Sequence, residues 1–278
     1  MNHVFPAPAK LNLFLHVVGR RADGYHLLQS LFRFIDRADE VHLELRDDGA
    51  VTRALDLPGV PEAEDLTVRA ARLLQAYAPP GAGVAVRLEK RLPMGGGLGG
   101  GSSDAATVLL ALNRLWNVNL SRAQLQALAL QLGADVPVFV FGQTAFAEGV
   151  GEILRTAAAP PAWYVVLTPP EHVATASIFA APELTRDTPP LKIAPFSAGM
   201  GRNDLEPVVV GRYPEVARHL AWLAQFGEAR MTGSGACVFA SFGTEDAARD
   251  VFRQLPGSMC GFVARGLDRH PLYDFCAG

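Results

Sequence analysis

Several features that mark common protein classes are missing from this sequence of 278 residues. Its three cysteines, Cys237, Cys260 and Cys276, lack C-x-x-C spacing, which indicates reduced thiols rather than a disulfide framework. Its seven histidines form no H-E-x-x-H motif, so we expect no tight transition-metal site. No apolar run approaches the ~20 residues of a membrane helix. The first residues lack the basic and apolar regions of a signal peptide.

The charge balance also excludes a group of partners. Lys plus Arg number 25 and Asp plus Glu number 28, for a net charge of −3. This balance offers no positive field for nucleic acid or for an anionic membrane. The composition is typical of a globular protein with one or two domains. We therefore expect small-molecule partners and a cytoplasmic location, and the sequence leaves the oligomeric state open.

The most informative feature that is present is a glycine-rich loop at residues 93–103. Six of the seven residues from Gly95 to Gly101 are glycine, and a helix-periodic apolar run begins at Ala105. Glycine lets backbone N–H groups approach a ligand closely, and a helix N-terminus adds free N–H donors with partial positive charge. The combination predicts an anion site, most simply for the phosphates of a nucleotide.

Three other interpretations of the loop are weaker. A flexible linker is not normally followed at once by an amphipathic helix. A Rossmann fingerprint matches Gly95, Gly97 and Gly100, but that motif needs a ribose-binding acid about 20 residues later. No Asp or Glu occurs between Asp104 and Asp135. A Walker loop is excluded because no Gly-Lys-[Ser/Thr] follows the glycines. A phosphate loop of a non-Walker type remains.

Hydrophobic periodicity and capping residues predict the secondary structure in outline. Asp65 can cap one helix, and Ser121 with Gln124 forms a capping-box pattern for another. We expect a constrained loop at 133–137 and a hinge between two halves at Pro160-Pro161. The expected strands are 10–18, 41–45, 84–88, 163–167, 236–242 and 259–266, and the expected helices are 66–78, 105–116, 121–133, 213–226 and 245–255. This mixed order predicts α+β halves with largely antiparallel sheets.

A phosphate loop directs attention to groups that activate an acceptor hydroxyl. Asp135 is the best candidate base, because glycine and proline restrict the turn that carries it, although it also fits an ordinary turn aspartate. Lys10 is the matching cation in an otherwise apolar strand, and a strand-end lysine reaching solvent is the alternative. Asp104, directly after the loop, can cap the following helix or help to hold magnesium.

Two further segments have both a functional and an ordinary interpretation. The second glycine cluster, Thr232–Ala236, either completes a phosphate or acceptor pocket or forms a plain hairpin turn. Tyr25 and His26 lie next to a charged turn, where they can stack on a planar base or form a partly buried aromatic pair. The residues alone leave both questions open.

Together these segments resemble the motifs of the GHMP small-molecule kinases. The three motifs of that family are similar to Pro8–Leu13 (PAKLNL), Pro93–Ser103 (PMGGGLGGGSS) and Thr232–Phe239 (TGSGACVF). Further segments resemble the members of the family that act on a cytidylated methylerythritol: Arg20–His26, Gly133–Phe139, Ala147–Glu152 and Arg202–Pro207. The similar segments extend over nearly the whole chain.

The resemblance implies a two-domain α+β fold with the active site in the cleft between the domains. The N-terminal domain, 1–157, would be ribosomal-protein-S5-like and the C-terminal domain, 158–278, ferredoxin-like. The implied reaction is ATP-dependent phosphorylation of the C2 hydroxyl of the cytidylated methylerythritol, in non-mevalonate isoprenoid biosynthesis. Another alcohol acceptor of the mevalonate or homoserine type is an alternative, and a nucleotide-binding oxidoreductase or a non-catalytic nucleotide-binding module is a more distant one.

The resemblance also assigns site residues by motif position. Lys10 and Asp135 would be the catalytic pair. Magnesium is expected with ATP, but no carboxylate pair identifies its ligands. The ATP phosphates would contact Pro93, Met94, Gly95, Gly96, Gly97, Leu98, Gly99, Gly100, Gly101, Ser102 and Ser103. The acceptor pocket would be lined by Asn12, Tyr25, His26, Thr175 and Phe179, with His26 stacking on cytosine.

Overall fold

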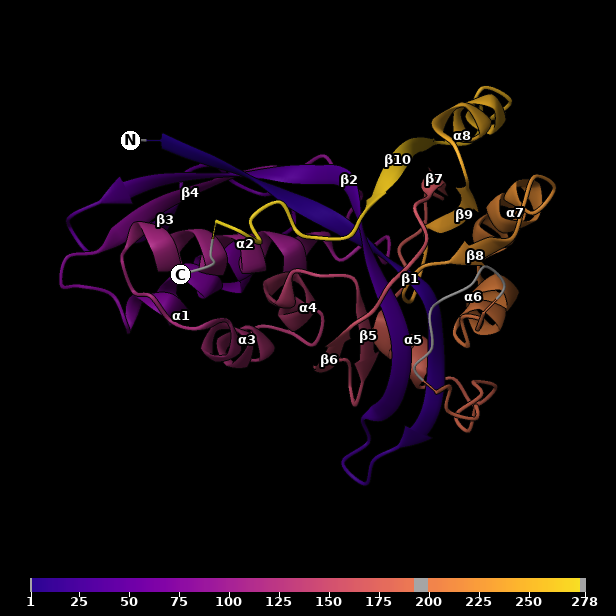
Figure 1. The fold of residues 1–278 in the computed structure, drawn as a ribbon, viewed down its shortest axis with the longest axis horizontal. Helices are drawn as coiled ribbons and strands as arrows, with labels where there is room; N and C mark the ends of the chain where they lie inside the picture. The colour runs from indigo at the N-terminus through magenta and orange to yellow at the C-terminus, as the bar shows by residue number, and fades with distance from the viewer. Residues whose placement is uncertain (1, 193–199, 276–278) are drawn as a thin grey trace.

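The computed structural model describes residues 2–192 and 200–275, and Cys276 lies outside this range. Within it, ten strands form one connected sheet in which the main path runs β3-β4-β2-β10-β7-β9-β8 (Figure 1). β1 and β5 also pair with β2, and β6 pairs with β5. Among the pairings between these strands in the described residues, only β3–β4 is parallel. The predicted α+β class with largely antiparallel sheets is confirmed.

Strands and helices occupy these segments of the chain. The strands are β1 (Asn2–Arg20), β2 (His26–Arg46), β3 (Val51–Arg53), β4 (Gly83–Glu89), β5 (Ala145–Glu148), β6 (Ile153–Thr156), β7 (Trp163–Leu167), β8 (Ala229–Met231), β9 (Val238–Phe242) and β10 (Gly261–Leu267). The helices are η1 (Glu62–Glu64), α1 (Leu66–Gln75), α2 (Gly100–Leu115), α3 (Arg122–Leu130), α4 (Val136–Phe141), α5 (Thr175–Phe179), α6 (Glu206–Arg212), α7 (Pro214–Leu223) and α8 (Glu245–Phe252).

The strands β1 and β2 are unusually long and extend through both halves of the molecule (Figure 1). They have 19 and 21 residues and pair antiparallel, with irregularities in register that bend the ribbon. The sequence predicted only parts of both strands. The part of β2 at 29–35 is buried at every position, so it has no alternation of polar and apolar residues to reveal it.

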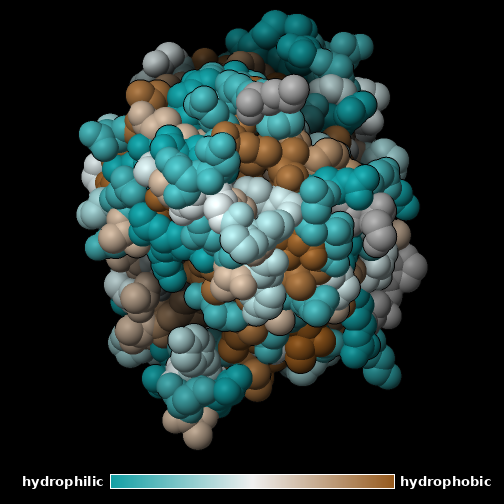
Figure 2. Space-filling view, turned by 90° about the vertical axis from the view of Figure 1, so that its left-hand side faces the viewer, coloured by the Kyte–Doolittle hydropathy of each residue, from teal (hydrophilic) through white to brown (hydrophobic). Residues whose placement is uncertain are grey.

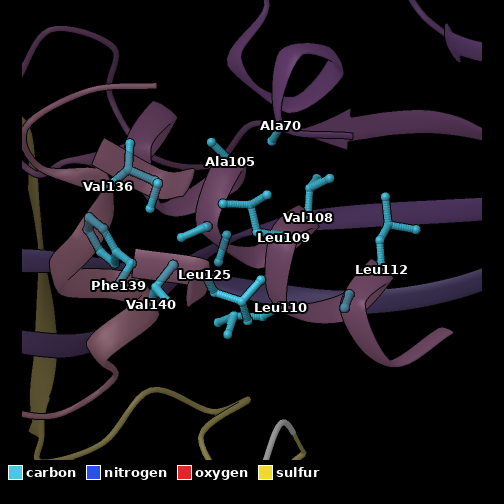
Figure 3. Close-up of a cluster of buried hydrophobic side chains, with 14 of the residues drawn as sticks. Ala70, Ala105, Val108, Leu109, Leu110, Leu112, Leu125, Val136, Phe139 and Val140 are labelled. Atoms are coloured by element: carbon cyan, nitrogen blue, oxygen red, sulfur yellow. The ribbon is translucent and has the colours of Figure 1, made fainter. Parts of the chain in front are cut away.

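A hydrophobic cluster in the first half centres on α2, which packs against β1, α1 and α4 (Figure 3). Val108, Leu109 and Leu112 of this helix are fully buried. The remaining residues from Ser103 to Asn113 are buried as well, so the helix is not amphipathic over this span. The helix is covered by the sheet on one side and by other helices on the other.

A second cluster occupies the half that contains β7, β9 and α7, and it includes two residues of β1, Leu15 and Val17. A third cluster lies between the first two and combines β1 and β2 with β7, β9 and β10. The long strands thus supply side chains to all three clusters. The boundary proposed at 157/158 stays a prediction.

Local capping signals agree with the structure, and one predicted loop does not. The Asp65 side chain caps α1 by accepting from Thr67 N at 2.9 Å, and Ser121 with Gln124 forms the capping box of α3. Helix α3 ends at Leu130, before the predicted Gly133. The segment 133–137 is only partly a loop, because α4 begins at Val136 with a proline in its first turn, where a missing N–H costs nothing.

The surface on the side of β3 and α1 is mostly hydrophilic, with hydrophobic residues in separate patches between the polar ones (Figure 2). This mixture is normal for a globular protein. Within the described residues, no helix has both the length and the apolar character that crossing a membrane requires.

Candidate active site

A cavity of about 1150 Å³ lies where the two halves meet. Its walls come from β1, β2, the glycine loop, the N-terminus of α2, the turn before α4, and α5. Of the predicted site residues, only Ser103 does not line it. Ser103 is fully buried within α2, and its hydroxyl has no hydrogen-bond partner. The cavity therefore collects residues that are more than 160 positions apart in the chain.

The glycine loop adopts a backbone that needs glycine at particular positions. Gly95, Gly97 and Gly99 have φ values of 72°, 75° and 73°, which side chains rarely tolerate. A Cβ at Gly97 would also lie only 2.2 Å from the carbonyl oxygen of Thr232. Gly99 is the N-cap residue of α2 and provides no side-chain cap, so free N–H groups of the first turn adjoin the cavity.

The second glycine cluster packs directly against this loop. The Cys237 N–H donates to Gly96 O at 3.1 Å, and the Thr232 hydroxyl lies 3.4 Å from Gly97 O. Gly233, Ser234 and Gly235 line the cavity. The same segment connects β8 to β9, which pair antiparallel, so it is a hairpin turn that also forms part of the cavity wall.

Lys10 connects the strand β1 to both glycine segments. Its side chain is 2% exposed, and its ammonium donates to Asn12 Oδ1 at 2.5 Å and to Gly97 O at 2.9 Å. The third group near the ammonium is Asp135 Oδ2, at 3.5 Å. An ammonium so buried requires partners of this kind. The interpretation of Lys10 as a lysine that reaches solvent is therefore wrong.

Asp135 is the more exposed member of this pair, with 45% of its side chain accessible. It is the residue directly before α4, and its backbone is fixed there by the helix that follows. Its carboxylate faces the cavity beside the glycine loop rather than serving as a helix cap, since it makes no cap hydrogen bond. The charged pair of Lys10 and Asp135 therefore lies next to the backbone N–H groups of the glycine loop.

The far end of the cavity carries aromatic side chains. The rings of His26 and Phe179 are 5.0 Å apart with an interplanar angle of 32°. Tyr25 is 63% exposed beside them, which leaves a face free for a planar ligand. The Thr175 hydroxyl lies 2.7 Å from that of Ser234, so α5 contacts the second glycine cluster. Asn12 lies instead with Lys10, and donates to Ser30 Oγ at 2.8 Å.

Asp104 belongs to a buried ion cluster beneath the glycine loop. The ammonium of Lys90 bonds both Asp104 Oδ2, at 2.9 Å, and Asp39 Oδ2. Asp39 Oδ1 in turn accepts from the backbone N–H groups of Arg91 and Leu92. Burial raises the pKa of Asp104 to about 8, against the opposing effect of Lys90. Asp104 lies inside α2, so the alternative that it caps this helix is wrong.

The cavity residues that the sequence did not predict include Lys90 and His172. Lys90 lines the wall next to Gly100, and its charged neighbours in the sequence gave no sign of burial. His172 reaches the loop from the other half, with Nδ1 2.6 Å from the position of a Cβ on Gly95. No motif or periodicity identified His172, because its placement depends entirely on how the two halves meet.

The described residues contain one close group of three potential metal ligands, Glu40, His42 and Glu89. None of them lines the cavity, and Arg87 Nη2 lies 2.6 Å from His42 Nδ1. A guanidinium can only donate there, so the imidazole has its lone pair engaged on that side. This group does not fit a magnesium ion that accompanies ATP. The carboxylate side chains that do line the cavity are those of Asp23, Glu64, Asp65, Asp104 and Asp135.

The fold and the site together indicate the protein family to which the chain belongs. Residues 65–143 match the family model described as "GHMP kinases N terminal domain", and residues 190–260 match "GHMP kinases C terminal". A crystal structure of mevalonate kinase superposes with a TM-score of 0.68 at 14% identity, covering 96% of this chain and all of the other. The chain belongs to the GHMP kinase family, and the predicted two-domain fold of that family is confirmed.

The more similar relatives share one name. A protein of Thiobacillus denitrificans, "4-diphosphocytidyl-2-C-methyl-D-erythritol kinase", is 82% identical over 275 residues, covering 99% of each chain. A crystal structure of 4-(cytidine 5'-diphospho)-2C-methyl-D-erythritol kinase has a TM-score of 0.80 at 35% identity, covering 95% of this chain and 99% of that one. The expected resemblance to kinases of this kind is thereby confirmed.

Proposed function

We propose that this protein transfers the γ-phosphoryl group of ATP to the 2-hydroxyl of 4-diphosphocytidyl-2-C-methyl-D-erythritol, yielding the 2-phosphate and ADP. The reaction belongs to non-mevalonate isoprenoid biosynthesis, and we place it in the cytoplasm. The observation that carries the proposal is the meeting of Lys10 and Asp135 beside the glycine loop in a cavity with an aromatic far end. The name and 82% identity of the Thiobacillus relative support the same acceptor.

The residues divide the work between binding phosphate and activating the hydroxyl. Backbone N–H groups of residues 94–102, which include the first turn of α2, hold the phosphates, because the glycines provide donors without a side chain in the way. Asp135 accepts or orients the proton of the acceptor hydroxyl. Lys10 lies 3.5 Å from the Asp135 carboxylate and adds positive charge where negative charge develops on the transferred group.

Magnesium fits this cavity without a dedicated protein cage, since Mg²⁺ bound with nucleotides usually takes phosphate oxygens, waters and one or two carboxylates. Asp104 and Asp135 are two of the carboxylates on the cavity wall: Asp104 follows the glycine loop directly in α2, and Asp135 lies beside Lys10. When bound, the ion would neutralise charge on the β- and γ-phosphates.

In this proposal the aromatic end of the cavity makes the enzyme selective for an acceptor that carries cytidine. The rings of His26 and Phe179, with Tyr25 beside them, offer faces on which a cytosine ring can stack. Thr175 and Asn12 add polar groups between that end and the loop. A mevalonate-type or homoserine-type acceptor has no planar base, so it gains nothing from these rings.

The test is a coupled assay of ADP formation with a panel of alcohols, including 4-diphosphocytidyl-2-C-methyl-D-erythritol, methylerythritol without the cytidine diphosphate group, mevalonate and homoserine. We expect transfer only to the cytidylated acceptor. Equal turnover of an acceptor without cytidine would reject the assignment. Asp135→Asn should abolish transfer while ATP binding by calorimetry is retained. Asp187→Asn, at an exposed position outside the cavity wall, is the matched control.

A further inference from the structure

Arg186 lies behind the aromatic end of the cavity and joins its parts. Its Nε donates to His26 Nε2 at 3.1 Å, and its Nη1 donates to Leu184 O at 2.9 Å. Its Nη2 donates to Phe179 O at 2.9 Å and to Ala181 O at 2.6 Å. The side chain is half-buried and does not line the cavity. Arg186 therefore touches the ring pair from outside the space that a ligand would fill.

These contacts determine the chemical state of His26. A guanidinium is only a donor, so His26 Nε2 must present its lone pair to Arg186, and the proton of the neutral ring is on Nδ1. Protonation of Nε2 would place two donors and two positive charges against each other. Burial, then Arg186 and Arg20, lower the pKa of His26, and no carboxylate is among the groups that act on it. The ring is thus kept neutral with one defined tautomer.

The same planar group also sets the spacing of the rings. His26 begins β2, whereas Phe179 ends the short helix α5, and these elements are more than 150 residues apart in the chain. Arg186 bonds the ring of one and the carbonyl of the other, so the 5.0 Å arrangement is fixed before any ligand arrives. A site that is arranged in advance loses less entropy on binding.

We propose that Arg186 is a positioning residue for recognition of the acceptor: it does not touch the acceptor but holds His26 against Phe179 and fixes the imidazole tautomer that faces the base. With the Nε2 lone pair engaged by Arg186, the imidazole keeps an uncharged face for stacking on the base. This inference depends on the proposed function, since it assigns the aromatic end to the cytosine of the acceptor.

The first test uses the unmodified protein and does not depend on activity. Long-range ¹H–¹⁵N NMR of protein labelled at histidine, assigned with His26→Gln, reports which ring nitrogen carries the proton. We expect the neutral Nδ1–H tautomer at pH 7. A predominant Nε2–H tautomer or a charged ring at that pH would overturn the proposal.

The second test is the kinetic comparison of Arg186→Lys with wild type. Lysine keeps the charge but cannot make four bonds in one plane. Losing a charge-assisted hydrogen bond typically changes an equilibrium by about 10-fold or more, so we expect the acceptor KM to rise by about that factor. The KM for ATP should stay within about 2-fold, a change well under 1.4 kcal/mol, because none of the four bonds of Arg186 goes to the glycine loop. Acceptor binding should also become sensitive to pH between 6 and 7, where an imidazole released from Arg186 gains its proton.

Arg212→Lys is the matched control. Arg212 bonds Glu183 and the carbonyl of Ser177 in the same region but makes no contact with His26. We expect Arg212→Lys to leave both KM values unchanged. Equal increases of both KM values in Arg186→Lys, or a loss that follows thermal stability in both variants, would assign Arg186 a structural role alone. If wild type does not turn over the cytidylated acceptor, the proposed function fails, whereas the tautomer measurement still decides the state of His26.

Discussion

Replacing Asp104 by asparagine should make the stability of the protein less dependent on pH. In the folded protein the carboxyl group is buried in the ion cluster with Lys90 and Asp39, and its pKa is raised to about 8. In the unfolded chain the same group has a pKa near 3.9. Between these values the folded state keeps a proton that the unfolded state has lost. The unfolding free energy therefore falls as the pH rises through this window.

The size of the effect follows from the two pKa values. The slope is about 1.4 kcal/mol per pH unit while only the folded state is protonated, and it levels off above the folded pKa. From pH 6 to pH 8 the wild-type protein should thus lose about 2 kcal/mol from this group. Asparagine has nearly the same shape and no proton to lose. Lys90 keeps its second partner, Asp39, in the variant.

The assay is urea unfolding at pH 6 and pH 8, followed by circular dichroism for wild type and Asp104→Asn. We expect the stability difference between the two proteins to shift by about 2 kcal/mol in favour of the variant at the higher pH. Asp187→Asn controls for the loss of a surface carboxylate. A difference that stays constant between the two pH values would show that Asp104 is already ionised at pH 6 in the folded protein.

Three further substitutions test other parts of the site and fold. Lys10→Met should lower kcat by about 10²–10⁴-fold, measured by single-turnover phosphoryl transfer, and wild-type turnover would remove Lys10 from the reaction. Gly97→Ala should raise the KM for ATP severely, because its Cβ would lie 2.2 Å from the Thr232 carbonyl; Gly243→Ala, where a Cβ meets nothing within 4 Å, should have no effect. Asp65→Ala should reduce the unfolding free energy by about 1 kcal/mol in thermal denaturation through loss of the α1 cap, and an unchanged midpoint would contradict this.

The parts of the fold that could be predicted from sequence are those fixed by neighbouring residues. The caps at Asp65 and Ser121 depend on side chains within three positions of the backbone they bond, so their spacing reveals them. The run of glycines at 95–101 could also be interpreted from the sequence, since the backbone freedom of glycine does not depend on its neighbours. The meeting of Lys10 with Asp135 was predicted through family motifs rather than from the residues alone.

The remaining features depend on contacts between distant segments. Helix α4 was missed because proline occurs both where helices end and in the first turn of helices. The residues around Pro137 do not show which applies, and it is packing that makes Pro137 the start of a helix. The cluster of Asp39, Lys90 and Asp104 combines side chains from β2, the loop and α2, none of which carries a local sign of burial. The bonds of Arg186 to both His26 and the end of α5 are likewise invisible without the tertiary structure.

The long ribbon of β1 and β2 has a consequence for protein engineering. Leu15 and Val17 sit among the apolar side chains of the second half, so the polypeptide before residue 158 supplies part of the interior of the C-terminal half. A chimaera that takes residues 158–278 from another kinase would inherit cavities or clashes wherever the donor's partners for Leu15 and Val17 differ in size. Exchanging acceptor preference between relatives therefore requires transplanting the first two strands together with the second half.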